Sequence, residues 1–234
     1  MDALSPEEIR VLGSLIEKSL TTPDNYPLTQ NALIAACNQL SNRNPVVAYD
    51  DNTVRLTLNG LRNRALARII HIPGSRAPKH RHILDEALEL DRQQLSLMCV
   101  LMLRGAQTTG ELRARTERMT QFASLTEVEE TLERLAERPD PLVLRLDRAP
   151  GQKESRWVHL LAGEPDVAAL NAEYATASWS EADSAAAPRP APREDRVAAL
   201  EARVTALEAA LAELRRELGH EAGPSDPGGY PLEP

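Results

Sequence analysis

Seven basic side chains between positions 52 and 84 form the segment of this sequence best suited to binding chemistry. They are Arg55, Arg62, Arg64, Arg68, Arg76, Lys79 and Arg81, and the same stretch contains no aspartate or glutamate. The whole chain has a formal charge of −8, but its acidic excess lies after residue 161. Because charges are screened over about 8–10 Å in physiological salt, the basic stretch can attract phosphate despite the distant acidic residues.

Asparagine side chains add hydrogen-bonding groups to this basic stretch. Helical spacing places Asn59 and Asn63 on an outward face, with Arg55 and Arg62 beside them. Arginine and asparagine make bidentate contacts with base edges in the major groove, and basic residues further along can contact flanking phosphates. The predicted DNA-binding residues are Arg55, Asn59, Arg62, Asn63, Arg64, Arg76, Lys79 and Arg81. The alternative is a solvated surface in a chain that prefers arginine to lysine.

Catalytic and metal-binding chemistry finds little support in the sequence. His80 and His82 alternate along a predicted strand and could face one metal ion, but no third ligand lies near them in the sequence. Cys37 and Cys99 fall in apolar helical patterns without a neighbouring histidine or acid, as expected of buried structural thiols. No glycine-rich phosphate loop is present. We therefore expect a protein that is not an enzyme and uses no cofactor.

A polar motif at Asn38–Asn44 has two interpretations. It could be a loop that binds DNA or a small ligand, because loops commonly carry function. Asparagine, serine and glutamine also bond nearby backbone in turns, which is their more common use. The sequence leaves both open.

The elements that position these residues follow from helix caps, apolar spacing and turn residues. Ser5 and Thr29 begin the first two helices, and one of the residues at 50–52 begins the third. Two β-prone runs follow, Arg68–Ile72 and His80–Leu84, joined by a segment containing proline and glycine. Three helices followed by a hairpin are the order of a winged helix.

The same order recurs in the next part of the chain. Asp91 and Thr109 begin two helices there, and Thr126 with Glu129 is predicted to form a capping box for the third. The apolar spacing is repeated 74 positions later, because Val54, Leu58 and Leu61 are matched by Val128, Leu132 and Leu135. Strands at 143–146 and 157–161 complete the second copy. A repeat with a matching element order is stronger evidence for the fold than either copy alone.

The third helix of the second copy differs from the first in charge. Its glutamates are Glu127, Glu129, Glu130, Glu133 and Glu137, and they outnumber its arginines. Such a face repels phosphate, so the second copy is predicted to be a packing or partner module. A smaller possibility is that Arg113, Arg115 and Arg118 contact DNA.

The last part of the chain predicts assembly. Residues 162–193 contain an Ala/Pro/Ser-rich linker, and residues 194–218 form a coiled-coil helix. Val197–Leu218 has unbroken apolar heptad spacing, which favours a homodimer, parallel or antiparallel. The alternative is that this helix packs on its own winged helices. Residues 219–234 are Gly/Pro-rich and predicted to be disordered.

Several long strings resemble the YceH family of bacterial proteins. They lie at 25–33, 36–39, 41–43, 101–105, 107–108, 110–113 and 150–152, within a likeness that covers roughly residues 4–161. Leu40 stands where the family tends to have lysine, which removes one possible phosphate contact; Ala106 and Thr109 replace prolines and relax a turn. The resemblance implies tandem winged helices and no established biochemical activity.

Together these features predict an α+β protein, mainly helical with small β-hairpin wings. The expected domains are a basic winged helix at 1–90, a second winged helix at 91–161, the linker, the coiled coil and the tail. The predicted function is DNA binding in transcription regulation through the first domain. The alternatives are a protein–protein adaptor and, less favoured, a ligand-sensing regulator. A signal peptide and a membrane-length apolar run are both missing from the sequence, so we expect a cytoplasmic protein with no membrane association.

Overall fold

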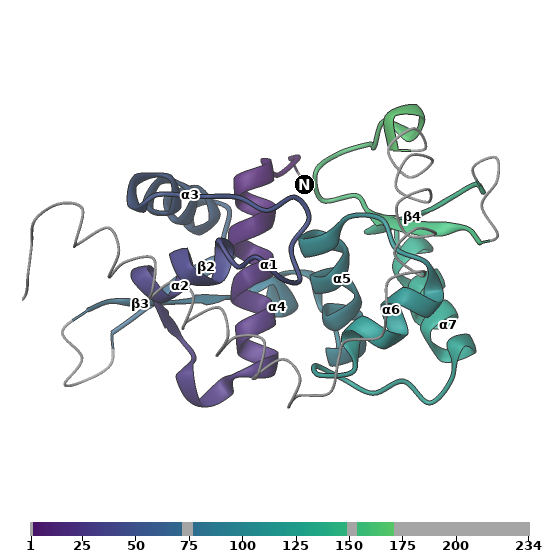
Figure 1. Cartoon of the computed structure of the whole chain (residues 1–234), viewed down its shortest axis with the longest axis horizontal. Coiled ribbons are helices and arrows are strands. Elements are labelled where there is room, and N and C mark those ends of the chain that lie inside the picture. The colour runs from purple at the N-terminus through teal and green to yellow at the C-terminus, as the bar shows by residue number, and fades with distance from the viewer. Residues whose placement is uncertain (1, 72–76, 149–153, 171–234) are drawn as a thin grey trace, which may run out of the picture. The chain divides into compact units, whose positions relative to one another are not determined.

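The computed structural model describes residues 2–71, 77–148 and 154–170 (Figure 1). All of them belong to one unit, Met1–Trp179. The predicted coiled coil, the tail and most of the linker lie outside the described residues. We call residues 2–90 the first half and residues 91–170 the second half.

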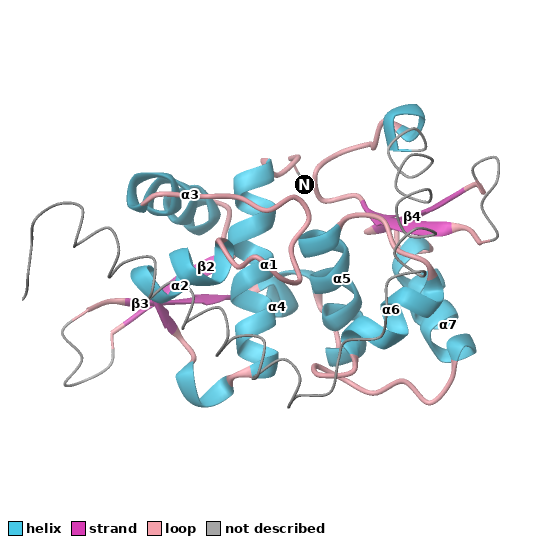
Figure 2. Ribbon diagram, in the orientation of Figure 1, coloured by secondary structure: helices cyan, strands magenta, loops and turns pink. Residues whose placement is uncertain are grey.

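The first half contains helices and one small sheet (Figure 2). Its elements are α1 (Pro6–Thr21), a 3-10 turn η1 (Pro23–Asn25), β1 (Leu28–Thr29), α2 (Gln30–Cys37), α3 (Asp51–Asn63), β2 (Ala67–Ile70), β3 (Lys79–His82) and α4 (Leu84–Leu88). The strands are antiparallel in the order β1-β3-β2. Arg68 pairs with Arg81 and Ile69 with His80 across β2 and β3.

The second half repeats the order of three helices and a hairpin. Its elements are α5 (Arg92–Arg104), α6 (Thr109–Thr116), α7 (Leu125–Ala136), β4 (Val143–Leu146) and β5 (Arg156–His159). The predicted α+β class with small antiparallel sheets is confirmed.

Side-chain caps fix where most helices begin. Ser5 and Asp91 each form a capping box, with Glu8 and Gln94 respectively. Asp50 is the cap of α3, and its carboxylate accepts from the backbone N–H of Thr53. Each cap satisfies an N–H that has no partner inside the helix, which stabilises the helix by about 1 kcal/mol.

Three local predictions differ from the structure. The capping box of Thr126 with Glu129 is wrong: Ser124 caps α7, and the Glu127 carboxylate accepts from the backbone N–H of Ala123. Strand β3 ends at His82 rather than Leu84, because the fully buried Leu84 begins α4, which was not predicted. The two-residue β1 was not predicted either, since its pairing with β3 depends on long-range contacts.

The two halves share one hydrophobic core, and α1 packs against α5 at its centre (Figure 1). Gly13 permits this close approach, because a Cβ there would lie 3.0 Å from Leu103 Cδ2. The thiol of Cys99 lies 3.5 Å from the carbonyl oxygen of Gly13, and both cysteines are buried and free, as predicted. Within the described residues, no helix is long and apolar enough to span a membrane.

Candidate nucleic-acid interface

Helix α3 carries the central part of the predicted DNA-binding set, and its inward face holds it in place. Val54, Thr57, Leu58 and Leu61 are buried, and the helix packs against α1 and α2 (Figure 1). The opposite face is open to solvent. The backbone that carries the outward side chains is therefore held in place by the packing of the inward face.

The outward face of α3 presents a line of three amides and one apolar side chain. Asn52 and Asn63 are exposed, Asn59 is half-buried, and Leu56 is 54% exposed. These positions follow one another at intervals of four, three and four residues, so they share one side of the helix. Sequence reasoning missed Asn52 and Leu56, although the same spacing that selected Asn59 and Asn63 includes them.

Two arginines flank this line and hold its amides. Arg55 Nη2 donates to Asn52 Oδ1 at 2.6 Å, and Arg62 Nη2 donates to Asn59 Oδ1. Within the residues that the structure describes, neither arginine forms an ion pair with a carboxylate. Their charges therefore remain available to an anionic partner.

Arg64, the residue that follows α3, forms intramolecular contacts rather than joining the outward face. Its Nε lies 3.2 Å from Glu8 Oε1, and its guanidinium donates to the carbonyl oxygens of Asp2 and Ala3. Gly60 makes room for the same carboxylate, because a Cβ there would lie 2.8 Å from Glu8 Oε1. Arg64 thus ties the start of the chain to the end of α3, and its charge is compensated.

The hairpin after α3 is less basic than its sequence indicates. Arg81 forms an ion pair with Glu86 at 2.5 Å, and Arg68 approaches the other oxygen of the same carboxylate at 3.5 Å. Lys79 is half-buried on the strand. Arg76 lies outside the described residues. The acid-free stretch is therefore partly neutralised by carboxylates that precede and follow it in the sequence.

The two strand histidines face the interior. His82 Nδ1 lies 3.3 Å from Asp85 and Nε2 lies 2.9 Å from Ser19 Oγ. Burial lowers the pKa of both histidines, and the charge of Arg62 lowers the pKa of His80 further. In the described part of the chain, no cluster of three or more histidine, cysteine or acidic side chains could hold a metal ion.

The polar motif at 38–44 is bonded into the fold. The side-chain amide of Asn38 exchanges two hydrogen bonds of 2.8 Å with the backbone of Tyr49. Buried Arg43 forms an ion pair with Glu17 at 2.6 Å and donates to the carbonyl oxygen of Ala36. The backbone N–H of Asn44 donates a hydrogen bond of 2.8 Å to the carbonyl oxygen of Leu103 in α5. These contacts support the structural interpretation of the motif.

Helix α7 offers a direct comparison with α3, because it occupies the equivalent place 74 residues later. The positions of Arg55, Leu56, Asn59 and Asn63 correspond to Glu129, Glu130, Glu133 and Glu137. Glu129 lies 3.2 Å from Arg145. The same framework therefore presents amides and arginines in one half and carboxylates in the other.

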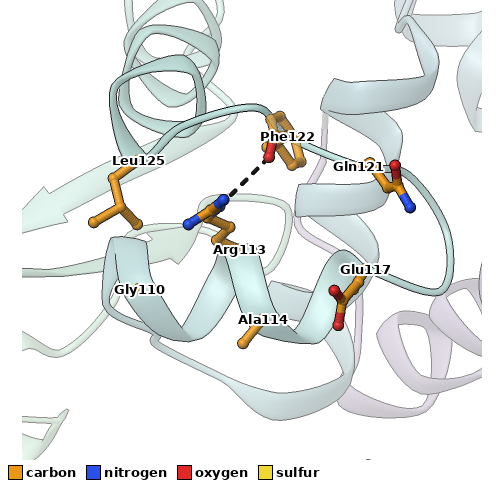
Figure 3. Close-up of a pocket in the computed structure, with 7 residues that line it drawn as sticks. All are labelled: Gly110, Arg113, Ala114, Glu117, Gln121, Phe122 and Leu125. Carbon is orange, nitrogen blue, oxygen red and sulfur yellow. Dashed lines mark hydrogen bonds between the residues drawn. The ribbon is translucent and has the colours of Figure 1, made fainter.

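The second half also contains an open cavity of about 630 Å³ along α6, shown in Figure 3. It is lined by Gly110, Arg113, Ala114, Glu117, Gln121, Phe122 and Leu125. Arg113 donates to the carbonyl oxygens of Phe122 and Ala123 at 3.4 Å. Arg113 thus holds the loop between α6 and α7 against α6.

Comparison with known proteins gives close relatives without an assigned activity. The model of a protein family of unknown function, DUF480, matches residues 4–152. A UPF0502 protein of Geobacter sulfurreducens is 54% identical over 166 residues, which cover 71% of this chain and 75% of the relative. A UPF0502 protein of Geotalea uraniireducens is 48% identical over 213 residues, 91% of this chain and 94% of the relative. The family likeness expected from the sequence is confirmed.

Proposed function

Since the chain belongs to the family of proteins of unknown function DUF480, we propose a function from its own surface: it binds double-stranded DNA in transcription regulation. The contacts are made by α3 and the β2–β3 hairpin. The protein acts by binding rather than by catalysis, and it needs no cofactor.

The proposal includes the assignment of both halves as winged helices. Each half has three helices followed by an antiparallel hairpin, the order that defines this motif. In such domains the third helix enters the major groove while the hairpin lies over adjacent backbone. In the first half, helix α3 follows α1 and α2 and precedes the β2–β3 hairpin, and we assign these two roles to α3 and that hairpin.

The observation that carries the proposal is the chemistry of the outward face of α3. Its two arginines, Arg55 and Arg62, bond to asparagine amides rather than to carboxylates. Arginine and asparagine are the side chains that bind base edges, and the arginine charge attracts phosphate. The glutamates at the equivalent positions of α7 would repel a duplex, so we assign DNA contact to the first half.

The C-terminal heptads at Val197–Leu218 extend the proposal to a homodimer. Two copies of α3 on one duplex would raise affinity through effective concentration. The linker length allows a range of half-site spacings.

The test is fluorescence anisotropy of the full chain on a labelled random duplex of about 20 base pairs. Joint replacement of Arg55 and Arg62 by alanine should weaken binding at least tenfold and reduce the slope of log K against log salt by about two. The matched control removes two exposed arginines of the second half, Arg134 and Arg148. Equal losses in both double variants would contradict the assignment of α3.

A second candidate function is a protein–protein adaptor, and the acidic face of α7 favours it for the second half. Replacing Glu130 and Glu133 by lysine should leave DNA affinity unreduced, because these exposed carboxylates only repel phosphate. If that variant loses DNA binding while its circular dichroism spectrum and melting temperature are unchanged, the two halves have been assigned the wrong way round.

A further inference from the structure

The outward line of α3 selects a particular chemistry of base pair. Its members are Asn52, Leu56, Asn59 and Asn63. Three are amides and one is an exposed aliphatic side chain; the guanidinium groups lie beside the line rather than on it. In the major groove, asparagine pairs with adenine through N6 and N7, and apolar side chains contact the methyl group of thymine. Guanine is recognised mainly by arginine or lysine, which this line does not contain.

From this arrangement we propose that α3 recognises A·T base pairs in the major groove, with its asparagines on adenine and Leu56 on a thymine methyl group. The inference rests on the proposed DNA binding and adds the class of sequence that is bound.

The arginine–asparagine bonds prepare the amides for this contact. In both pairs the arginine lies three residues after the asparagine, and its guanidinium donates to Oδ1. An amide oxygen has two lone pairs, so Oδ1 can still accept from adenine N6. The amide Nδ2 is left to donate to adenine N7. Arg55 and Arg62 are thus positioning residues for Asn52 and Asn59, and fixing the amides beforehand lowers the entropy lost on binding.

The spacing of the two pairs fits a duplex. Asn52 and Asn59 are seven residues apart, which is about 10.5 Å along the helix axis. Base pairs rise by about 3.4 Å, so the two amides are separated by about three base pairs along the groove. Leu56 lies between them and reaches an intermediate base pair. Asn63 lies four residues beyond Asn59, about 6 Å along the helix axis, which adds about two base pairs. The preferred site is therefore a run of about six base pairs with A·T pairs opposite the three asparagines.

The half of the chain that lacks this line provides an internal contrast. The positions equivalent to Leu56 and Asn59 are glutamates of α7, and the position equivalent to Asn63 is Glu137, the C-cap of that helix. Carboxylates accept hydrogen bonds from cytosine N4 but cannot donate to adenine N7. The proposed A·T preference therefore belongs to α3 alone.

The experiment compares the full chain on duplexes of equal length by fluorescence anisotropy across a salt series. One duplex is A·T-rich with mixed order, and one is G·C-rich. Two others repeat the A·T-rich sequence with 7-deazaadenine for adenine or deoxyuridine for thymine. We expect at least about fivefold tighter binding to the A·T-rich duplex than to the G·C-rich one, because one bidentate pair alone discriminates by that factor or more. Removing N7 should abolish most of the preference, and removing the methyl group should reduce it.

Variants on the outward face of α3 assign the preference to single side chains. Asn59→Ala should lower affinity for the A·T-rich duplex toward that for the G·C-rich one, while the salt slope stays the same. The affinity of the Leu56→Ala variant should be the same for the A·T-rich duplex with thymine and for the one with deoxyuridine. Arg62→Lys retains a positive charge and should keep the salt slope but lose part of the preference, since a lysine cannot hold the amide in the same way. Glu133→Ala, at the position equivalent to Asn59, is the matched control and should keep the full preference.

The experiment distinguishes failure of the A·T inference from failure of the proposed DNA binding. Equal, steeply salt-dependent binding to A·T-rich and G·C-rich duplexes would overturn the A·T inference and leave the proposed DNA binding standing. A preference that survives joint replacement of Asn52, Leu56, Asn59 and Asn63 by alanine would overturn the assignment of the preference to this line. No salt-dependent binding to any duplex would overturn both the inference and the proposed function.

Discussion

At the scale of single residues, the structure divides the basic side chains by what they already bond. Arg64 and Arg81 are paired with carboxylates, whereas Arg55 and Arg62 are bonded to neutral amides. A charge that is compensated locally contributes little to the field that a phosphate meets. The basic surface that can attract phosphate is thus smaller than the count of arginines indicates, and it is centred on Arg55 and Arg62.

Buried Arg43 is another residue whose role depends on its partner. Its guanidinium is held by Glu17, and the bond and charge of Arg43, with Lys18, lower the pKa of the Glu17 carboxyl, although burial alone would raise it. A depressed carboxyl pKa stabilises the folded state above the unfolded value of about 4.3, and the contribution is lost as pH falls through the folded pKa.

We therefore predict a pH-dependent effect for Glu17→Gln. Unfolding free energy at pH 7 should fall by about 3 kcal/mol, because the variant leaves a buried arginine without its counter-charge. The difference from the natural chain should shrink as pH falls below the unfolded pKa of about 4.3 and through the lower folded pKa, because Glu17 is then protonated in both folded and unfolded chains. Urea unfolding at several pH values measures both. A difference of the same size at every pH would show that the ion pair does not contribute.

At the scale of elements, caps and apolar spacing predicted most of the fold. Ser5, Asp50 and Asp91 begin helices where the sequence places them, since capping depends on residues three positions apart. Strand β1 escaped prediction because it is two residues long and exists only through β3. The N-terminus of α7 was misplaced because Ser124 and Thr126 are both acceptable caps, and packing decides between them.

The candidate site was predictable to a similar degree. Periodicity found Asn59, Asn63 and their flanking arginines, because a helix face follows from local sequence. Periodicity could not predict that Glu8 compensates the charge of Arg64, because the two residues are far apart in the chain. They meet only through the packing of α1 on α3. The structural role of Arg43 was hidden for the same reason.

The contact between α1 and α5 gives a prediction about packing. Gly13→Val should destabilise the fold by about 1–3 kcal/mol, because its side chain would overlap Leu103 and push the helices apart. Gly110→Ala on α6 is the matched control: a Cβ there meets nothing closer than 3.9 Å, so stability should rise by up to about 1 kcal/mol. Thermal unfolding of both variants provides the measurement, and an unchanged melting temperature for Gly13→Val would contradict the close packing.

At the scale of the whole molecule, the two halves behave as one body because their core is continuous. Leu103 of α5 touches Gly13 of α1, and the 38–50 loop is bonded to α5. The second half can therefore stiffen the first without contacting DNA itself. DNA contact by the first half and structural support by the second agree with the opposite charges of α3 and α7.

Assembly gives a prediction at this scale. The full chain should be a dimer in light scattering at micromolar concentration, through the heptads at Val197–Leu218. A chain ending at Ala187 should be a monomer or a weaker dimer with lower DNA affinity, because the two α3 helices are no longer linked. A monomeric full chain would exclude this arrangement.

The central claim is that α3 and its hairpin bind DNA, and the salt dependence of binding to a random duplex tests it most directly. Glu8 compensates Arg64, and the single carboxylate of Glu86 compensates one of the two charges of Arg68 and Arg81. Among the described residues this leaves Arg55, Arg62, Lys79 and one further positive charge, so log K should fall against log salt with a slope of about −3 to −4 per domain. Arg64→Ala should retain that slope, and joint replacement of Arg55, Arg62 and Lys79 by alanine should remove most of it. A flat salt dependence in the unaltered chain would contradict the account.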